Sequence, residues 1–216
     1  MANDVFNRIA KVYGWFHRHQ MKRFEEILAT HSDSIDLSSM HSICDVGCGT
    51  GALCAVLGAR GFEVTGVDPA EKMLEVARRK VANASVVFVK GDAIKGLPFE
   101  DKRFDVVFTS HVAHGMGPQE RRKLYLELKR IARRAVVVHD YNENREILTT
   151  IIEWLERGDY FGFIKRPKEE MEEVFSTIST IQVGKRANWY ICTCGSTEQS
   201  PDHTGDEGEA VEEEDS

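Results

Sequence analysis

The fold is decided by the stretch SICDVGCGTG, residues 42–51. A short apolar run from Ser42 to Val46 passes directly into three closely spaced glycines, Gly47, Gly49 and Gly51. This pattern predicts a buried strand and then a tight turn that opens a helix, because glycine adopts backbone conformations that other residues avoid. In an open α/β sheet such a turn borders the ligand crevice, so the stretch indicates both a fold class and a site.

The same alternation continues along the chain. Short β-branched runs predict further strands at 62–68, 85–90, 104–110 and 135–140. Helical patterns between or after them predict helices at 51–60, 70–82, 118–132 and 144–157. Strands that alternate with helices are typical of βαβ units, whose right-handed crossovers cover both faces of a parallel sheet.

The two ends of the domain complete the predicted sheet and its cover. A short helix near 168–175 leads into two strand-like runs joined at Gly184-Lys185, which predicts an antiparallel hairpin at the sheet edge. Residues 4–30 have apolar side chains at helical spacing around Gly14, as expected for one or two helices over the sheet. We therefore expect an α/β fold with a doubly wound, mostly parallel, seven-stranded Rossmann-like sheet.

Composition sets the domain organisation. With 216 residues, 42% of them hydrophobic, the chain can form one domain without disulfides or a structural metal. The net charge of −7 comes from the end of the chain, because nine acidic residues follow position 197 and no Lys or Arg follows Arg186. We expect a domain over 1–196 and a disordered acidic tail over 197–216.

Apolar runs and cysteines indicate the compartment. No stretch reaches 18 consecutive apolar residues and the first 16 residues do not form a signal-peptide core, so a cytoplasmic location without a membrane span is expected. The five cysteines fit this as reduced thiols. Cys192-x-Cys194 has no second cysteine pair nearby, which favours an ordinary strand over a zinc site. The oligomeric state is left open.

Three carboxylates fall at the predicted ligand edge. Asp45 precedes the glycines, Asp68 ends the next strand, and Asp92 follows the third strand. Asp68 suits hydrogen bonds from a ribose, although a single Asp before a helix can also be only a cap. Asp45 would repel a pyrophosphate and attract an ammonium or sulfonium group. Carboxylates around one crevice favour a ligand that carries positive charge.

These segments together resemble the class I S-adenosylmethionine-dependent methyltransferases, of the methyltransferase type 11 group that includes ubiquinone and menaquinone biosynthesis enzymes. The matching pieces are DVGCGTG (45–51), VTGVDPAEKMLEVAR (64–78), GDA (91–93) and FDVVFTSHVAH (104–114). The resemblance implies S-adenosylmethionine as cofactor, S-adenosylhomocysteine as product, and a cofactor site made of Tyr13, Asp45, Gly47, Cys48, Gly49, Gly51, Asp68, Pro69, Met73, Asp92, Ala93, Ser110 and His111. Gly14 replaces the acid that usually follows the tyrosine. Considered alone, Met73 could instead be a core residue, and Cys48 could be present in the loop only because it is small.

Histidines at the ends of the fourth and fifth strands are the candidate catalytic groups. Methyl transfer needs an in-line, dry arrangement, and a hydroxyl or ammonium acceptor also benefits from a base near neutral pKa. His111, His114 and Asp140 are the predicted catalytic residues, with His139 either in the same pocket or in the core. A loop histidine without chemistry is the alternative for His111 and His114. The same residues with Asn142 could gather a metal, but related metal-dependent enzymes resemble this chain only at Asp140, so none is expected.

The acceptor is predicted to be a small molecule. Four aromatic residues near Gly158 and Gly162 could cover an apolar acceptor or simply cap the core: Trp154, Tyr160, Phe161 and Phe163.

Three rival functions were weighed against methyl transfer. An NAD(P)-dependent dehydrogenase is suggested by Tyr125 and Lys129 one turn apart, and the glycine turn with Ala52 also satisfies G-x-G-x-x-A. The first loop lacks the T-G-x-x-x-G-x-G pattern of the short-chain dehydrogenases, however, and Tyr125 is expected to pack on the sheet while Lys129 reaches solvent. Nucleic-acid binding or modification, as by an RNA methyltransferase, is suggested by a stripe of basic residues. A solvated helix face is the better account of these seven side chains: Arg121, Arg122, Lys123, Lys129, Arg130, Arg133 and Arg134. A catalytically silent S-adenosylmethionine-binding partner protein remains possible from sequence.

Overall fold

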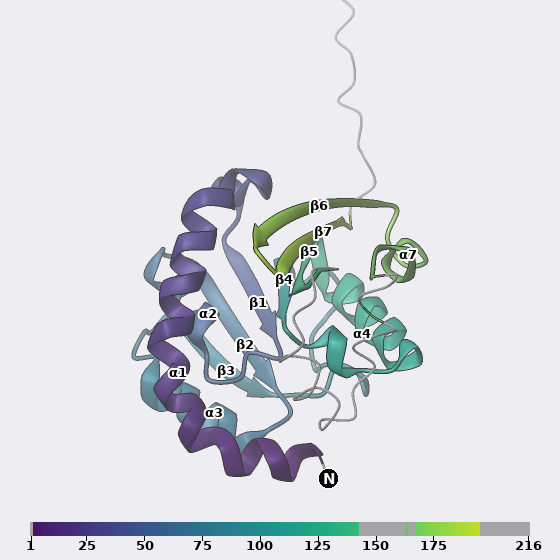
Figure 1. Ribbon diagram of the computed structural model, residues 1–216. Coiled ribbons are helices and arrows are strands. Elements are labelled where there is room, and N and C mark those ends of the chain that lie inside the picture. Colours follow the sequence, from purple (N-terminus) through teal and green to yellow (C-terminus); the bar gives the residue numbers. More distant parts are fainter. Residues whose placement is uncertain (1, 143–162, 164–166, 195–216) are drawn as a thin grey trace, which may run out of the picture.

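The computed structural model describes residues 2–142, 163 and 167–194, with side chains from His17 onward. Its centre is a seven-stranded sheet in the order β3-β2-β1-β4-β5-β7-β6 (Figure 1). In chain order the strands are β1 (Ser42–Val46), β2 (Glu63–Asp68), β3 (Val86–Lys90), β4 (Phe104–Ser110), β5 (Ala132–Tyr141), β6 (Thr177–Gly184) and β7 (Ala187–Thr193). Neighbours among β1 to β5 are parallel, and β7 is antiparallel to both β5 and β6. The predicted fold class is confirmed.

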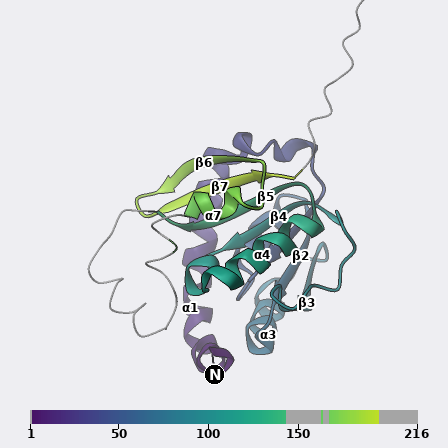
Figure 2. The same cartoon turned by 90° about the vertical axis from the view of Figure 1, so that its right-hand side faces the viewer.

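Helices cover both faces of the sheet. They are α1 (Ala2–His31), α2 (Ala52–Ala59), α3 (Glu71–Lys80), α4 (Pro118–Ile131) and α7 (Pro167–Glu172). Helices α1, α2 and α3 lie on one side, and α4 and α7 lie on the other (Figures 1 and 2). The N-terminal segment is one helix that continues through Gly14. The helix expected at 144–157 and the acidic tail lie outside the described residues.

The core forms because the central strands bury both of their faces. The first six residues of β4 are buried, as expected for a parallel strand between two helical layers. Val107 belongs to the apolar cluster that includes Leu124 of α4, whereas Phe108 belongs to the cluster that includes Leu53 of α2. Each such side chain contributes about 1.5–3 kcal/mol when fully buried. This packing fixes the positions of the carboxyl ends of the strands, where the site lies.

The basic residues around α4 form only in part the solvated helix face that the sequence suggested, because Arg122 and Lys123 are exposed but Arg121 is not. Arg121 is fully buried and forms an ion pair with Glu170 of α7. Arg133 and Arg134 belong to β5, which begins at Ala132 rather than at 135. Strand pairing extends this far, with Ala132 opposite Phe104 of β4, and Arg133 forms an ion pair with Asp105 while Arg134 donates a hydrogen bond to Ser39 Oγ. Tertiary partners therefore decide where this helix ends.

The β6–β7 hairpin returns the chain to the ligand edge. Tyr141 at the end of β5 pairs with Ala187 at the start of β7, so the turn between β6 and β7 lies beside the carboxyl end of β5. The backbone N–H of Asn142 donates to the Arg186 carbonyl at 3.0 Å. Within the described ranges, no helix has the length and apolar character needed to cross a membrane.

Candidate active site

The turn between β1 and α2 depends on three left-handed glycines. Gly47, Gly49 and Gly51 have φ values of +80°, +53° and +77°. A Cβ on Gly47 would come within 2.4 Å of Val112 Cγ2, and one on Gly51 within 2.8 Å of Phe88 Cζ. A Cβ on Gly49 would meet no atom within 4 Å. Two glycines therefore allow close packing of the protein, and Gly49 borders open space that a ligand can enter.

Asp45 is buried below this turn with one oxygen unpartnered. It is 2% exposed; its Oδ2 accepts a hydrogen bond from Cys54 Sγ at 3.4 Å, and its Oδ1 has no partner among the described residues. Burial raises the pKa of this carboxyl to about 7, a rise that the Cys54 hydrogen bond reduces and the charge of Asp68 increases. A buried acceptor without a donor is costly unless a ligand supplies one. The atom fits the ammonium group of a bound amino acid moiety.

Asp68 fastens the glycine turn to the end of β2. Its Oδ2 accepts from the Gly49 N–H at 2.9 Å, and its Oδ1 accepts from the Ala70 N–H at 2.8 Å. Burial raises the pKa of Asp68 although both hydrogen bonds act against the rise. Each carboxylate oxygen can accept a second hydrogen bond, so capping the chain and holding a ribose are compatible roles. Pro69 is exposed beside it.

The predicted adenine end is less enclosed. Asp92 Oδ1 accepts from the Ile94 N–H at 3.1 Å, and its Oδ2 forms an ion pair with Lys95. Ala93 packs against the core cluster on the α4 side. Met73, 4% exposed, is buried in a small cluster with two neighbours, Ala70 and Val76, as a core residue would be.

Helix α1 is docked on the glycine turn through a contact that sequence reasoning missed. His17 Nδ1 lies 3.2 Å from Thr50 Oγ1, and both side chains are buried. Burial lowers the pKa of His17, with a further lowering by Lys80. Tyr13 lies one turn earlier in α1, ahead of the first described side chain, and its role stays a prediction.

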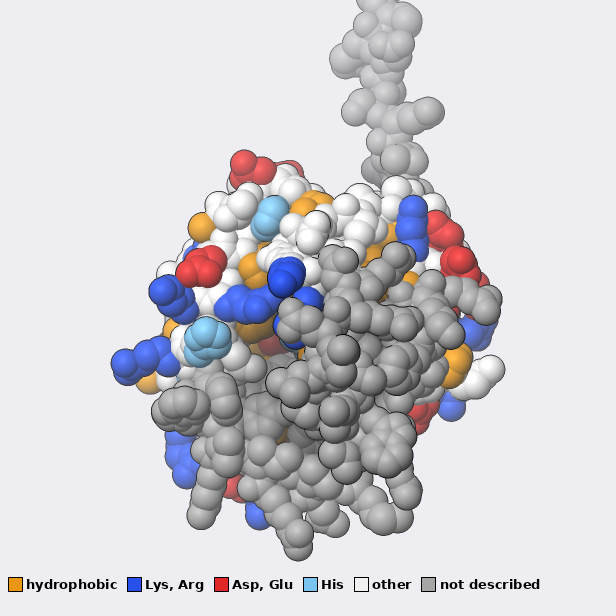
Figure 3. Space-filling model, in the orientation of Figure 1, with side chains coloured by type: hydrophobic (Ala, Val, Ile, Leu, Met, Phe, Trp, Pro, Cys, Tyr) orange, Lys and Arg blue, Asp and Glu red, His pale blue; other side chains and the backbone are white. Residues whose placement is uncertain are grey.

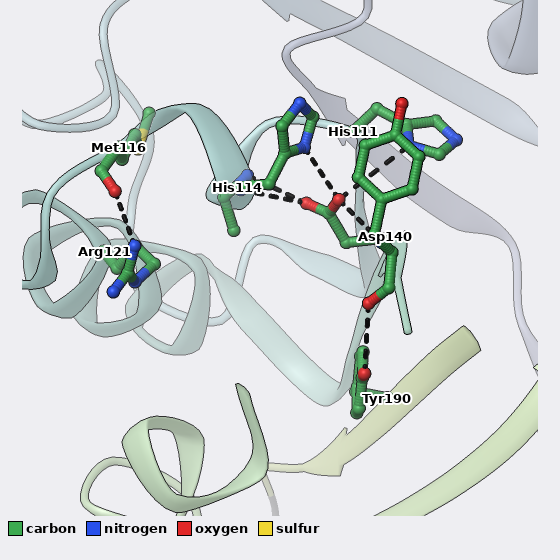
Figure 4. Close-up of polar contacts among 8 residues, drawn as sticks. His111, His114, Met116, Arg121, Asp140 and Tyr190 are labelled. Carbon is green, nitrogen blue, oxygen red and sulfur yellow. Dashed lines mark hydrogen bonds and ion pairs between the residues drawn. The ribbon is translucent and has the colours of Figure 1, made fainter. Parts of the chain in front are cut away.

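A second cluster gathers at the ends of β4 and β5 (Figure 4). His114 Nδ1 lies 2.8 Å from Asp140 Oδ1, and His111 Nδ1 lies 3.8 Å from the same oxygen. Asp140 Oδ2 accepts from the Ala113 and His114 N–H groups at 3.1 and 3.3 Å. The structure thus brings together all three predicted catalytic residues.

Asp140 is suited to hold its two histidines as an anion. Its burial alone would raise the pKa, but the charge and hydrogen bond of His114, the charge of His111 and the Tyr141 N–H lower it below its ordinary value. Because the carboxylate accepts at Nδ1, the neutral His114 ring carries its basic lone pair on Nε2. Tyr141 packs beside both histidines, with ring centroids 5.0 Å from His111 and 4.7 Å from His114.

Residues between the two clusters are strained or unsatisfied. His111 has φ +55°, and its side chain is 37% exposed. Burial lowers its pKa, the charge of Asp140 raises it, and the charges of His114 and Arg23 lower it. The Ser110 hydroxyl is buried without a partner. Strain and an orphan hydroxyl are typical of a site that a ligand completes.

The same three residues have the composition of a metal site. One ligand atom from each of His111, His114 and Asp140 lies within 4.8 Å of the others. However, Asp140 Oδ1 already accepts from His114 and from the Tyr141 N–H. Asn142, which sequence reasoning added to this set, donates to Asn188 Oδ1 and to the Lys185 carbonyl. The hydrogen-bonded arrangement accounts for the geometry without an ion.

His139 lies at the inner edge of this cluster, on the α1 side of the sheet. It is 1% exposed, packs edge-to-face on Phe24 of α1, and its ring centroid is 4.8 Å from that of His111. Burial, helped by the charge of His111, lowers its pKa to about 3. His139 thus lies in the core, and within the described part of the chain neither of its ring nitrogens has a hydrogen-bond partner.

The dehydrogenase pair is absorbed into the core. Tyr125 is fully buried, as expected. Lys129 does not reach solvent freely, since its Nζ donates to the Val174 carbonyl at 2.6 Å. Of the four aromatics proposed to cover the acceptor, Phe163 is fully buried beside the Arg121 guanidinium, which favours its structural reading. Trp154, Tyr160 and Phe161 lie outside the described residues.

Comparisons with known proteins identify the family. A methyltransferase-domain family model matches residues 44–139. An uncharacterised methyltransferase of Bacillus licheniformis is 30% identical over 155 residues, which are 69% of this chain and 70% of the relative. The demethylmenaquinone methyltransferase of Staphylococcus aureus is 52% identical, but over only 68 residues, 29% of this chain and 27% of that enzyme.

The fold comparison agrees. A solved structure of a putative S-adenosylmethionine-dependent methyltransferase from Methanococcus maripaludis has a TM-score of 0.64 at 20% identity, covering 89% of this chain and 94% of that one. The predicted resemblance is confirmed, as is S-adenosylmethionine as the cofactor at the level of the family. The chain belongs to the class I S-adenosylmethionine-dependent methyltransferases.

Proposed function

We propose that this protein transfers a methyl group from S-adenosylmethionine to a small-molecule acceptor bound between the glycine turn and the His111–His114–Asp140 cluster. The observation that carries the proposal is the unpartnered Oδ1 of Asp45, buried below the open space at Gly49. A ligand ammonium placed there gives the buried acceptor its missing donor.

Each end of the cofactor has residues to hold it. The glycine turn with Asp45 and Cys48 takes the methionine portion, and Ser110 with His111 lines the same side. Asp68 and Pro69 take the ribose. Met73, Asp92 and Ala93 border the adenine, and Tyr13 covers the crevice.

When bound, the cofactor supplies an electrophilic methyl group on a positively charged sulfur. The chain's own residues orient the acceptor and manage its proton. His114 accepts the proton from an acceptor hydroxyl or ammonium on Nε2, while Asp140, 2.8 Å from its Nδ1, stabilises the charge that the ring gains. His111, in its neutral form, lies between the methionine portion and the acceptor. Asp140 is a positioning residue in this scheme.

Calorimetric titration with S-adenosylmethionine, S-adenosylhomocysteine and NADH tests cofactor choice. We expect binding of the two sulfur nucleosides and none of NADH. Asp68→Ala should weaken their binding by about 1–3 kcal/mol, the scale of hydrogen bonds to a charged group. Asp105→Ala is the matched control, because Asp105 is equally buried and accepts backbone N–H bonds from His41 and Ser42, but at the opposite end of the sheet. Micromolar NADH affinity with no sulfur-nucleoside binding would refute the proposal.

A labelled-methyl screen of hydroxyl, amine and thiol acceptors tests the transfer. With the acceptor so identified, His114→Gln should lower kcat by about 10²–10⁴-fold, the contribution of a positioned base, and leave cofactor affinity within about twofold. His41→Gln, an exposed histidine at the other sheet edge, should change neither value. Cofactor binding without transfer to any acceptor would favour the silent binding protein instead.

A further inference from the structure

A groove between α1 and the β6–β7 turn lies beside the proposed catalytic cluster. Its volume is about 420 Å³, within the range of small-molecule sites. The polar lining residues are His19, Lys22, Arg23, Glu26, Thr30, His31 and Lys185, and the apolar ones include Ile27 and Val183. Lys and Arg side chains gather toward the middle of this face, with two histidines near them (Figure 3).

The described lining of the groove carries more positive than negative charge, with Lys22, Arg23 and Lys185 against Glu26. Lys22 Nζ lies 4.0 Å from Oε1 of Glu26, the acidic lining residue, and both side chains are well exposed. Arg23 is exposed, and within the described residues its guanidinium has no hydrogen bond or ion pair. A planar guanidinium binds the oxygens of a carboxylate or phosphate in pairs, so the charge of the groove favours an anionic ligand.

The backbone makes room for this arginine at the end of β6. An added Cβ at Gly184 would lie 2.9 Å from Arg23 Nη2, so the absent side chain lets the guanidinium rest against the strand end. The β6–β7 turn is tied to the end of β5 through Asn142 and Arg186. The groove therefore opens at the same sheet edge as Asp140.

The electrostatics link Arg23 to the histidines. Its positive charge contributes to the lowered pKa of both His111 and His139. Its neighbour in α1, Phe24, packs on His139, whose ring lies 4.8 Å from that of His111. An anion held at Arg23 is thus within electrostatic reach of His111 and His139.

We infer that this groove binds an anionic group, a phosphate or carboxylate, of the methyl acceptor, with Arg23 as the main ligand and Lys22 and Lys185 beside it. The assignment of the anion to the acceptor rests on the proposed function; the anion site itself does not. The reacting atom of such an acceptor lies toward His114, and its apolar part lies against Ile27 and Val183.

The anion site is tested first, without any acceptor. The full chain is titrated with inorganic phosphate and with acetate, and binding is followed by backbone amide NMR shifts. We expect the shifts of residues 19–31 and 183–185 to change. Arg23→Gln should weaken phosphate binding at least tenfold. Arg18→Gln, an exposed arginine of the same helix outside the groove, should not. Equal phosphate binding by Arg23→Gln and wild type, or shifts outside the groove, would overturn the site.

The link to the acceptor is tested second. For acceptors from the methyl screen, paired with neutral analogues, Arg23→Gln should raise KM of the anionic member at least tenfold and leave that of the neutral one and the cofactor Kd unchanged. Methyl transfer by Arg23→Gln with an unchanged KM for the anionic acceptor would overturn the inference and leave the proposed function standing. Arg23-dependent phosphate binding without methyl transfer to any acceptor would support the anion site and overturn the proposed function. Salt-sensitive RNA binding in the groove, with no binding of phosphate, would overturn the inference and assign the groove to nucleic acid.

Discussion

Asp45 combines burial, an unpartnered oxygen and a position beside the glycine turn. Its pKa is raised to about 7 from an ordinary 3.8, chiefly by burial. The free protein therefore favours the neutral acid below pH 7, whereas a cationic ligand requires the carboxylate. The folded pKa exceeds the unfolded one, so this group's contribution to stability is present below about pH 3.8 and is lost as the pH rises through about 7.

Cofactor affinity should accordingly rise with pH across this window. Between pH 6 and 8 we expect up to about tenfold tighter S-adenosylmethionine binding, the change in carboxylate fraction for a group titrating near 7. Asp45→Asn should bind more weakly and show a flat profile. Titration calorimetry at four pH values measures both, and a slope retained in the variant would assign the titration to another group.

At the level of elements, the turn from β1 to α2 separates packing from ligand access. Gly47 and Gly51 are restricted by Val112 and Phe88, whereas Gly49 faces open space. All three have positive φ, which costs other residues about 1–2 kcal/mol. The pattern of three glycines is one signal in the sequence, but the neighbours of each glycine come from different elements.

Gly47→Ala and Gly49→Ala form a matched pair. Gly49→Ala should cost only the backbone strain, about 1–2 kcal/mol, but weaken cofactor binding because the methyl group enters ligand space. Gly47→Ala should cost more stability, since the methyl group also collides with Val112. Urea unfolding and cofactor titration separate the two effects. Wild-type cofactor affinity in Gly49→Ala would show that no ligand approaches this glycine.

For the whole molecule, a buried ion pair joins the C-terminal section to the body. Arg121 of α4 is fully buried, and its Nη2 donates to Glu170 Oε1 of α7 at 2.7 Å, while its Nη1 donates to the Met116 carbonyl. Met116 follows His114 by two residues. The pair thus connects α7 to the loop that holds the catalytic cluster.

Breaking this pair should destabilise the fold strongly. Glu170→Gln removes the negative charge that pairs with the buried guanidinium, and we expect a loss toward the lower end of about 3–5 kcal/mol. Glu172→Gln removes an exposed partner of Lys168 on the same helix and should cost less than about 1 kcal/mol. Equilibrium urea unfolding compares the two. Equal losses would mean that the Arg121 pair adds nothing beyond a surface pair.

The sequence by itself determined the alternation of strands and helices, the hairpin, the glycine turn and the carboxylates at strand ends, because periodicity and glycine chemistry act locally. It also placed His111, His114 and Asp140 at one sheet edge, since parallel strands end together. Only the tertiary structure decided which charges are buried. Arg121 faces inward because it pairs with Glu170, which is 49 positions away in the sequence. Arg23 faces the groove because the β6–β7 hairpin folds back against α1. Such pairings depend on packing between distant segments, and no local pattern specifies them.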